Sequence, residues 1–526
     1  MPASKSLRRL GLTTAALVAA VFFFLVATLP PNPVSISLDN VDPALRARTV
    51  SGAYHVHTSR SDGAADKASV AAAAARAGQQ FVIVTDHGDA TRTPDPPAYL
   101  SGVLCIDAVE ISTAHGHYVA LDLPAAPYPL AGEPAAVVED VKRLGGFGLV
   151  AHPDHPKLEL SWTEWDEPVD GIEWLNADVE WRNESRLRLL RVLFDYLVRP
   201  GPALASVFDR PERTFVHWDG LEAVRPVVGL AAADAHGAGS NQREEGEAPS
   251  FNAGPGYEAS FRSLSNRVLI ERPLSGEPRE DARLILDGIR QGRVYSVIDA
   301  ISKDVVLARD ETGRFGLASA ALAVQIATSG SLSRPRLELH TARAPGDPPV
   351  PWVIGNWSGN RQASTPPSNG IPNMTSGERF KLTSEWRVEK DPVSSGSASG
   401  AEAGVTLGYQ LAAGRRASQF VAAVADLDPS VSFNMIAFRA RSERPMRVSV
   451  QVRLLPDDSR WVRSVYLDSS ARDVALSLRD FRPAEGGAGG VPDASRARSI
   501  LFVVDLVNAR PGDAGTFAVE NLRILR

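Results

Sequence analysis

The sequence predicts an α/β fold, namely a parallel β/α barrel or a related layered fold, followed by an all-β C-terminal region. Three observations lead to this prediction. Between Val50 and Ala300, short apolar runs alternate with helical patterns, as in barrels of alternating strands and helices. From Val405 on, apolar and polar residues alternate with period two, which is typical of an antiparallel β-sandwich. Histidines and carboxylates recur where the strands of the first half are expected to end, which is the face of a barrel that carries chemistry.

Length and composition set the outer limits of the fold and function. A chain of 526 residues is long enough for two to four domains. The formal net charge of −6 gives no general attraction to nucleic acid, so no nucleic-acid partner is expected. The single cysteine, Cys105, excludes an intramolecular disulfide, and its apolar surroundings predict a buried strand position.

The N-terminus has the pattern of an export signal. Lys5, Arg8 and Arg9 precede an apolar stretch from Leu10 to Leu29, which is about the ~20 residues that a membrane span needs. No small-x-small cleavage site stands clearly at its end, so residues 1–33 are predicted to anchor the protein in the cell membrane. The positive charges predict a cytoplasmic N-terminus and a periplasmic or extracellular body. Secretion after cleavage is the alternative.

The predicted elements follow in order. Residues 34–49 are expected to form a linker and residues 50–301 the barrel. Asp66 is a candidate N-cap and Gly78 a helix stop. The helix over Trp181–Val198 rests on an apolar stripe of Leu187, Leu190, Phe194 and Leu197. The strands are expected at Tyr54–His57, Phe81–Thr85, Val103–Ser112, Tyr118–Leu123, Phe147–Ala151, Gly171–Leu175 and Val227–Ala232, and the other helices at Asp66–Ala77, Pro134–Leu144 and Arg279–Arg290.

Five motifs hold the candidate metal ligands. His55 and His57 are two residues apart on a strand, so both rings are expected on one face, and Asp234 and His236 repeat this spacing. Imidazoles and carboxylates suit Zn, Mn and Fe, and a set this large exceeds the needs of one ion. A hydrogen-bonded core without metals would bury many charges at high cost. The motifs are HVHTSRSDG (His55, His57, Asp62), TDH (Asp86, His87), EISTAHGHYVAL (Glu110, His115, His117), AHP (His152) and ADAH (Asp234, His236).

In order and spacing, this series resembles the PHP (polymerase and histidinol phosphatase) superfamily of metal-dependent phosphoesterases, over about residues 51–299. The segment 268–302 is similar to its exported, carbaryl-hydrolase-like branch. The resemblance implies a distorted (β/α)7 barrel with two or three divalent ions. It implies that Glu110 bridges the first two metals, and that His117 is preferred over His115 because it directly precedes YVAL. The implied ligands are His55, His57, Glu110 and Asp234 (also the catalytic residues) for the first metal, Glu110, His117 and His152 for the second, and Asp62, His87 and His236 for the third.

Other polar residues are candidates for the pocket wall. Glu173 and Asn176 lie at another predicted strand end, and His155 follows the AHP motif. Arg243, in the polar stretch after His236, is a candidate to neutralise a phosphate. Asp86 is a candidate to orient His87.

Residues 302–345 are predicted to form a small β extension, and residues 346–526 a β-sandwich or jelly-roll. This last domain resembles galactose- or carbohydrate-binding domains, which makes a glycan a possible partner. Its tryptophans either stack on sugars or pack in the core, and these are Trp352, Trp357, Trp386 and Trp461.

These features predict a metal-dependent hydrolase, a phosphoesterase in which a metal-bound hydroxide attacks a small-molecule or glycan-linked phosphoester or ester. No Ser nucleophile elbow of the GxSxG type is present. Three alternatives stay open. A carboxyl or carbamate esterase would use the same site, an amidohydrolase-type enzyme would also open with H-x-H, and an anchored glycan-binding protein would use the barrel as a scaffold.

Overall fold

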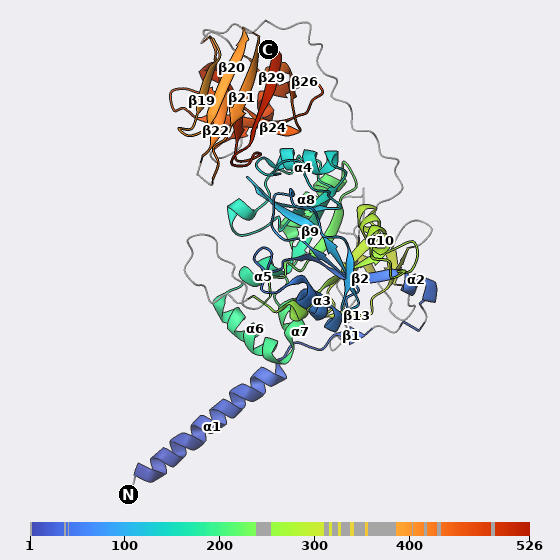
Figure 1. Cartoon of the computed structure of the whole chain (residues 1–526). Coiled ribbons are helices and arrows are strands. Elements are labelled where there is room, and N and C mark those ends of the chain that lie inside the picture. Colours follow the sequence, from blue (N-terminus) through green and yellow to red (C-terminus); the bar gives the residue numbers. More distant parts are fainter. Residues whose placement is uncertain are drawn as a thin grey trace.

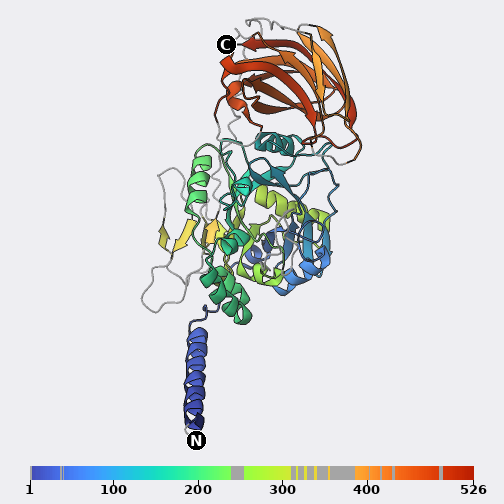
Figure 2. The same cartoon turned by 90° about the vertical axis from the view of Figure 1, so that its left-hand side faces the viewer.

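A mixed α/β part and an all-β part follow a long N-terminal helix in this computed structural model (Figures 1 and 2). The structure describes residues 3–35, 38–39, 41–237, 254–309, 315–317, 325–327, 337–340, 353–355, 385–401, 403–414, 418–428, 433–484 and 490–525. The order of the two parts confirms the coarse prediction of an α/β region followed by an all-β region. The all-β part lies at the opposite end of the molecule from the N-terminal helix.

Helix α1 (Ala3–Ala27) extends away from the α/β part (Figure 1). Its side chains are described from Leu12 on, and the large apolar ones are exposed, with Leu17 66% and Phe23 74% accessible. Among the residues that the structure describes, no helix combines the length and apolarity needed to cross a membrane.

The predicted linker contains regular structure. Strand β1 (Val34–Ser35) pairs in parallel with β13 (Ser302–Lys303), and helix α2 (Pro43–Ala47) starts at Asp42, whose side chain accepts a hydrogen bond from Ala44 N. The described residues of the predicted linker are thus partly helical and partly paired in a sheet.

Two sheets form the α/β part. The larger has the order β16-β17-β18-β12-β11-β2-β3-β5-β4, in which β2, β3 and β5 are parallel. The smaller has the order β10-β9-β8-β7-β6. The strands of the larger sheet are β2 (Thr49–Val56), β3 (Phe81–Val84), β4 (Ala98–Leu100), β5 (Val103–Asp107), β11 (Ser265–Leu269), β12 (Val294–Val297), β16 (Gln325–Ala327), β17 (Leu337–His340) and β18 (Val353–Gly355). Those of the smaller sheet are β6 (Val109–Thr113), β7 (Gly116–Leu121), β8 (Phe147–Ala151), β9 (Gly171–Asn176) and β10 (Val228–Ala232).

Two single bridges join the edges of the smaller sheet to internal strands of the larger one: Ala235, after β10, pairs with Val56 of β2, and Glu110 of β6 pairs with His87, after β3. A single closed barrel of parallel strands is not what the structure shows. Strand β7 runs antiparallel to both β6 and β8. The reason is local: only Ala114 and His115 separate β6 from β7, and two residues can close a hairpin but cannot make a parallel crossover.

Three of the four predicted helices of the α/β part are present, the fourth is divided, and three further helices among the described residues, Pro200–Ala205, Glu212–Glu222 and Tyr257–Ser263, were not predicted. The predicted Trp181–Val198 helix is divided into α5 (Ala177–Arg182) and α6 (Arg186–Val198), with Ser185 capping α6. Its leucine stripe is exposed rather than packed in the core, with Leu187 82% and Leu197 84% accessible. The remaining helices are α3 (Lys67–Arg76), α4 (Pro134–Arg143), α7 (Pro200–Ala205), α8 (Glu212–Glu222), α9 (Tyr257–Ser263) and α10 (Pro278–Arg290).

The described strands between Ser302 and Gly355 belong to three different sheets. Strand β18 pairs with β12 and β17 pairs with β18, so these strands widen the larger sheet. Strand β14 (Leu307–Arg309) pairs separately with β15 (Phe315–Leu317).

The C-terminal region is two antiparallel sheets, of order β19-β22-β28-β24-β25-β27 and β20-β21-β29-β23-β26. Their inward residues form one core around Phe438, Phe502 and Phe517, as the period-two pattern predicts. The strands are β19 (Arg387–Lys390), β20 (Ser395–Ala401), β21 (Gly404–Gln410), β22 (Phe420–Asp426), β23 (Met435–Ser442), β24 (Met446–Leu454), β25 (Arg460–Leu467), β26 (Arg472–Ser477), β27 (Arg482–Pro483), β28 (Ala497–Asp505) and β29 (Ala514–Leu525).

The sandwich packs on α4 through a buried ion pair. The guanidinium of Arg447, 1% exposed, donates to both carboxylate oxygens of Asp140, at 2.7 and 2.8 Å. The guanidinium of Arg143, on α4, lies 3.5 Å from the ring centroid of Tyr466, on strand β25 of the sandwich. The Tyr466 ring packs into a hydrophobic core cluster of the α/β part. Because Arg447 and Asp140 are each only 1% exposed, their charge-assisted bonds fix how the two parts contact each other.

Candidate metal centre

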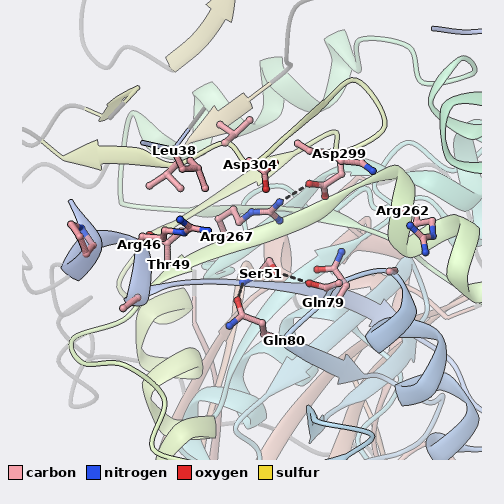
Figure 3. Close-up of a pocket in the computed structure, with 17 residues that line it drawn as sticks. Leu38, Arg46, Thr49, Ser51, Gln79, Gln80, Arg262, Arg267, Asp299 and Asp304 are labelled. Carbon is pink, nitrogen blue, oxygen red and sulfur yellow. Dashed lines mark hydrogen bonds and ion pairs between the residues drawn. The ribbon is translucent and has the colours of Figure 1, made fainter. Parts of the chain in front are cut away.

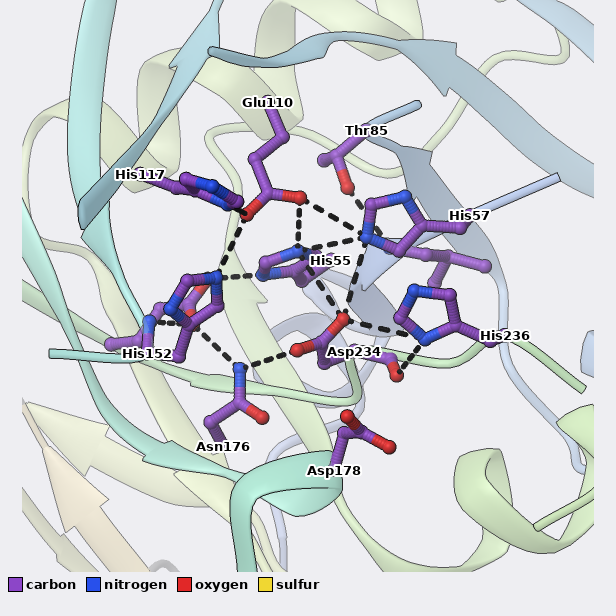
Figure 4. A network of polar contacts seen from close by, with 12 residues as sticks. His55, His57, Thr85, Glu110, His117, His152, Asn176, Asp178, Asp234 and His236 are labelled. Carbon is purple, nitrogen blue, oxygen red and sulfur yellow. Dashed lines mark hydrogen bonds and ion pairs between the residues drawn. The ribbon is translucent and has the colours of Figure 1, made fainter. Parts of the chain in front are cut away.

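Five loops and strand ends bring the nine candidate ligands together, and Figure 4 labels seven of them, without Asp62 and His87. His55 and His57 lie at the end of β2 and after it, His87 follows β3, and His152 follows β8. Glu110 and His117 come from the β6–β7 hairpin, Asp234 and His236 follow β10, and Asp62 lies in the loop after β2. Eight of the nine line a cavity of about 370 Å³, and His55 lies directly beneath it at 0% exposure.

The backbone is strained at three of these strand ends. His55 has φ +62°, His152 +28° and Asp234 +42°, a region that residues other than glycine rarely adopt. The surrounding structure holds this geometry: Ala235 N donates to His55 O at 3.2 Å, and Tyr257 Oη donates to His57 O at 2.9 Å. Strain of this kind persists where packing overdetermines it, and it clusters at functional sites.

The first group of donor atoms is compact. His55 Nε2 lies 3.1 Å from His57 Nε2, 3.1 Å from Glu110 Oε2 and 3.5 Å from Asp234 Oδ1. His57 Nε2 lies 3.2 and 3.4 Å from the same two oxygens. Ligand atoms that each lie about 2.1 Å from a tetrahedrally coordinated ion are about 3.4 Å from one another. The five distances fit one ion, and His55, His57 and Glu110 place ligand atoms within 4.8 Å of one another.

The chemistry of the donors also fits a cation. His55 Nδ1 lies 2.5 Å from Glu173 Oε1, so this nitrogen carries a proton and donates it. The other nitrogen, Nε2, is then a lone-pair acceptor in the neutral ring, and it faces two carboxylate oxygens, which are acceptors too. Acceptors gathered at this distance need a positive charge between them, supplied by a metal ion or by protons.

Glu110 joins a second group of donors to the first. Its other oxygen, Oε1, lies 2.8 Å from His117 Nδ1 and 2.9 Å from His152 Nε2. The two oxygens of one carboxylate thus face two separate sets of imidazoles, as a bridging ligand does.

A third group surrounds Asp62. Its Oδ2 lies 3.1 Å from His236 Nε2 and 3.6 Å from His87 Nε2, and its Oδ1 lies 3.4 Å from His57 Nδ1. These four side chains place one ligand atom each within 4.8 Å of one another. Asp62 and His87 are 27% and 34% exposed, so this group is the one nearest solvent.

The pKa shifts of the cluster indicate that its ionised carboxylates need positive charge beside them. Burial opposes protonation of His57, but Asp234 and Glu110 outweigh it and raise the pKa of His57 to about 10. Burial also opposes ionisation of Glu110, yet the facing imidazoles His55, His87 and His117 hold its pKa well below the usual range. The carboxylates stay ionised, and without metals the imidazoles would take up protons to balance them.

The hairpin decides between the two candidate histidines after Glu110. His117 points at Glu110, whereas His115 lies in the turn, where its backbone N–H donates to Thr113 Oγ1 at 3.1 Å.

The side chain of Asp86 accepts hydrogen bonds from Thr58 N at 2.7 Å and from Ser61 Oγ at 2.8 Å. It therefore shapes the loop that carries Asp62 rather than orienting His87.

The predicted wall residues separate into three cases. His155 lines the cavity, where burial and the neighbouring His152 lower its pKa to about 4. Asn176 lies beneath it and donates to Glu173 Oε2 at 2.9 Å and Asp234 Oδ2 at 3.0 Å, so it positions ligands. Arg243 lies outside the described residues.

The sequence analysis did not single out the two cationic side chains that line the cavity. Lys157, from the loop after β8, and Arg182, on α5, line it, and Arg182 pairs with Asp178. Neither residue stands in a recognisable motif. Glu173 was predicted only as a possible wall residue, but its carboxylate holds both His55 Nδ1 and the backbone N–H of His152, at 2.8 Å.

A larger cavity of about 600 Å³ lies elsewhere, between α2, the start of β2 and the segment 299–306 (Figure 3). Arg267 and Asp299 pair across it at 2.5 Å. None of the predicted site residues lines this cavity, so the smaller cavity is the one that holds the ligand chemistry.

Comparisons with known proteins concern the sandwich. No family model and no curated protein matches the chain. Solved structures similar to the C-terminal all-β region include a family 11 carbohydrate-binding module from Clostridium thermocellum in complex with a β-1,3-1,4-mixed-linked tetrasaccharide. It is 18% identical over 28% of this chain and 92% of that chain, with a TM-score of 0.23. Another is TmCBM61 in complex with β-1,4-galactotriose, at 11% identity over 28% and 91% of the two chains and a TM-score of 0.17. Scores this low carry no conclusion about what the sandwich binds.

The two described tryptophans of the sandwich are partly buried against its core. Trp386 and Trp461 pack against the sandwich core, and Trp386 lies 6.1 Å from Phe502, ring centre to ring centre. Trp352 and Trp357 lie outside the described residues.

Proposed function

We propose that this chain is a metal-dependent phosphoesterase of the PHP type that holds two or three divalent ions, Zn, Mn or Fe, in the histidine-rich cavity. The observation that carries the proposal is the position of Glu110. Its two oxygens face two separate sets of imidazoles at 2.8–3.3 Å. A bridging carboxylate between neutral imidazoles is the arrangement that binuclear hydrolases use.

The side chains have distinct roles in this proposal. His55, His57, Glu110 and Asp234 hold the first metal, His117 and His152 the second with Glu110, and Asp62, His87 and His236 the third. Bound divalent ions supply Lewis acidity and acidify a water molecule. Glu173 fixes the ring of His55 through Nδ1, and Asn176 fixes the carboxylate of Asp234.

Two cations in the cavity lining support a phosphate. Lys157 and Arg182 line the same cavity as the carboxylates and imidazoles, and Arg182 pairs with Asp178. Arginine and lysine beside a metal cluster stabilise the negative charge of a phosphoryl group as it is transferred. A small-molecule or glycan-linked phosphoester fits a cavity that is lined by both candidate metal ligands and cationic side chains.

We also propose that the two bridged sheets work as one distorted (β/α)7 barrel, because the candidate ligands follow strands of both sheets and meet at one end. Helix α1 is proposed as a single-pass anchor that leaves the body outside the cytoplasm, with secretion after cleavage as the alternative.

Three other functions remain as alternatives. A carboxyl or carbamate esterase would use the same cavity. An amidohydrolase-type enzyme would keep the H-x-H pair but commonly needs a bridging lysine where this chain has Glu110. A glycan-binding protein with a scaffold barrel would bind sugar through the sandwich and need no metal.

Elemental analysis of the purified full chain, together with hydrolysis of phosphomonoester, phosphodiester and carbamate substrates, tests the proposal. We expect two to three transition-metal ions per chain, a partial loss of metal in His57→Ala, and hydrolysis of a phosphoester that needs Mn or Zn. His217→Ala is the matched control, because His217 stacks on Trp165 at 4.0 Å, away from the cavity. Metal-loaded protein with no activity on any phosphoester would overturn the assignment, and carbamate hydrolysis alone would favour the esterase.

A further inference from the structure

We propose that helix α6 lies on the surface of a lipid bilayer, as a second membrane contact beside α1. Its outward face carries five large apolar side chains, with exposed fractions of 82% for Leu187, 65% for Leu190, 48% for Leu193, 84% for Leu197 and 52% for Val198. An apolar stripe on a helix normally packs against a core, and a contiguous exposed one marks an interaction surface. In α6 the side chains that turn inward are Val192 and Asp195 instead.

The position of α6 identifies the partner. Arg191 Nη2 of α6 donates to Leu25 O at 3.0 Å, and the guanidinium of Arg199 donates to Pro30 O. Helix α6 is therefore bonded to the C-terminal end of α1, at the end of the domain from which α1 departs (Figures 1 and 2). Whatever surrounds α1 also meets the apolar face of α6.

The described side chains of α1 require an apolar medium on all sides. Phe22, Phe23 and Phe24 are 61%, 74% and 63% exposed, and successive helical residues point about 100° apart. One protein groove covers one face of a helix and leaves the others in water. Lipid surrounds a helix completely, so the three phenylalanines favour a bilayer over a partner protein.

The charges of α6 are compatible with this partner. Its three arginines are Arg186, Arg188 and Arg191; Arg188 pairs with Glu184 and Arg191 with Asp195, and Arg186 is exposed. Helices that lie in the membrane interface combine an apolar face with arginines or lysines, which attract anionic headgroups.

Docking of α6 would also fix the height of the candidate metal centre above the bilayer. Arg182 of α5 lines the cavity, and Leu187 follows five residues later. Five residues span at most about 18 Å, so the cavity wall stays close to the membrane surface.

This inference rests on the proposed membrane attachment through α1, and the experiment separates the two. The full chain is reconstituted into vesicles of about three parts phosphatidylcholine to one part phosphatidylglycerol, with doxyl-labelled phosphatidylcholine as quencher. Leu190→Cys carries an environment-sensitive fluorophore. The native Cys105 is 4% exposed, and unlabelled wild-type protein checks that it does not react. The control is Val224→Cys, at a site that is 77% exposed just after α8.

We expect the fluorophore at position 190 to be quenched about twofold or more, because interfacial helices bury their apolar face about 5–10 Å into the headgroup region. The label at position 224 should stay unquenched. If the chain floats with the vesicles while both labels stay in water, α6 docking is wrong and anchoring by α1 stands. If the chain does not float, both are wrong. Shielding of the position 190 label by a second copy, seen as a dimer without lipid quenching, would also overturn the inference. None of these outcomes depends on metal content, so the proposed activity is judged separately.

Discussion

Replacing Glu110 with glutamine should separate the two proposed metal positions. Glu110 Oε1 faces His117 and His152 at 2.8 and 2.9 Å, and Oε2 faces His55, His57 and His87 at 3.1 to 3.3 Å. A glutamine side chain has one oxygen and one NH₂ group, and the NH₂ is a donor that cannot bind a cation. Whichever way the amide turns, one of the two groups loses its ligand oxygen.

The size of the effect follows from this geometry. Loss of an outer-shell partner typically costs about 10–100-fold in metal affinity, and loss of a direct ligand costs at least the upper figure. We therefore expect one position to weaken by about 100-fold or more, or about 2.7 kcal/mol, while the other keeps its oxygen. The metal content of dialysed protein should fall by about one ion per chain.

Mass-spectrometric metal analysis and competition with a chelator measure both quantities. Glu173→Gln is the graded control: this carboxylate holds His55 Nδ1 but does not face the candidate ion, so stoichiometry should be kept and affinity reduced by about 10–100-fold. Unchanged metal content and affinity in Glu110→Gln would refute the bridging role and with it the proposed metal cluster.

Three further results are expected. His117→Ala should remove about one metal ion per chain, whereas His115→Ala should remove none, because only His117 faces Glu110. Arg447→Ala should destabilise the fold by about 3 kcal/mol in denaturant unfolding, because it leaves Asp140 buried with Arg143 as its remaining cation. Glu133 has a pKa raised to about 7, mainly by burial, so the folded state binds its proton more tightly than the unfolded state does. Stability should therefore fall by about 3 kcal/mol as the pH rises from about 4.5 to 7, and Glu133→Gln should remove this loss.

Each of these expectations has a control. Arg441→Ala, at an exposed position in β23, should leave unfolding unchanged, and equal effects of Arg441→Ala and Arg447→Ala would contradict the role of the buried pair. A Glu133→Gln variant whose stability falls with pH as the wild type does would show that another group is responsible. Equal metal loss from the two histidine variants would place the second metal elsewhere.

The residues that make up the candidate metal site could be predicted from the sequence. The two-residue spacing of His55 and His57, and of Asp234 and His236, predicted that each pair shares one face. The resemblance of the five motifs to the PHP superfamily implied the set of nine side chains, which the structure brings together. The spacing is informative because strand ends at one edge of a sheet converge. The period-two pattern after Val405 likewise predicted the antiparallel sandwich, since alternation reports directly which face is buried.

Contacts between distant segments could not be predicted in this way. Nothing in the sequence links Arg182 to the cavity, or Arg447 to Asp140 across 307 positions, because such pairs depend on how the elements pack. The helical stripe of α6 shows the same limit. Periodicity told which residues share a face, and only the packed structure showed that this face points outward.

For this protein the sequence by itself indicated the types of candidate metal ligand, their order and the coarse class of each half, because these depend on local periodicity and side-chain chemistry. The tertiary structure alone decided which carboxylate oxygen faces which imidazole and that β7 runs antiparallel. It also showed that three ligand-bearing residues sit at positive φ. These features depend on the position of backbones that are remote in sequence, and the free energy that fixes them comes from packing rather than from any one residue.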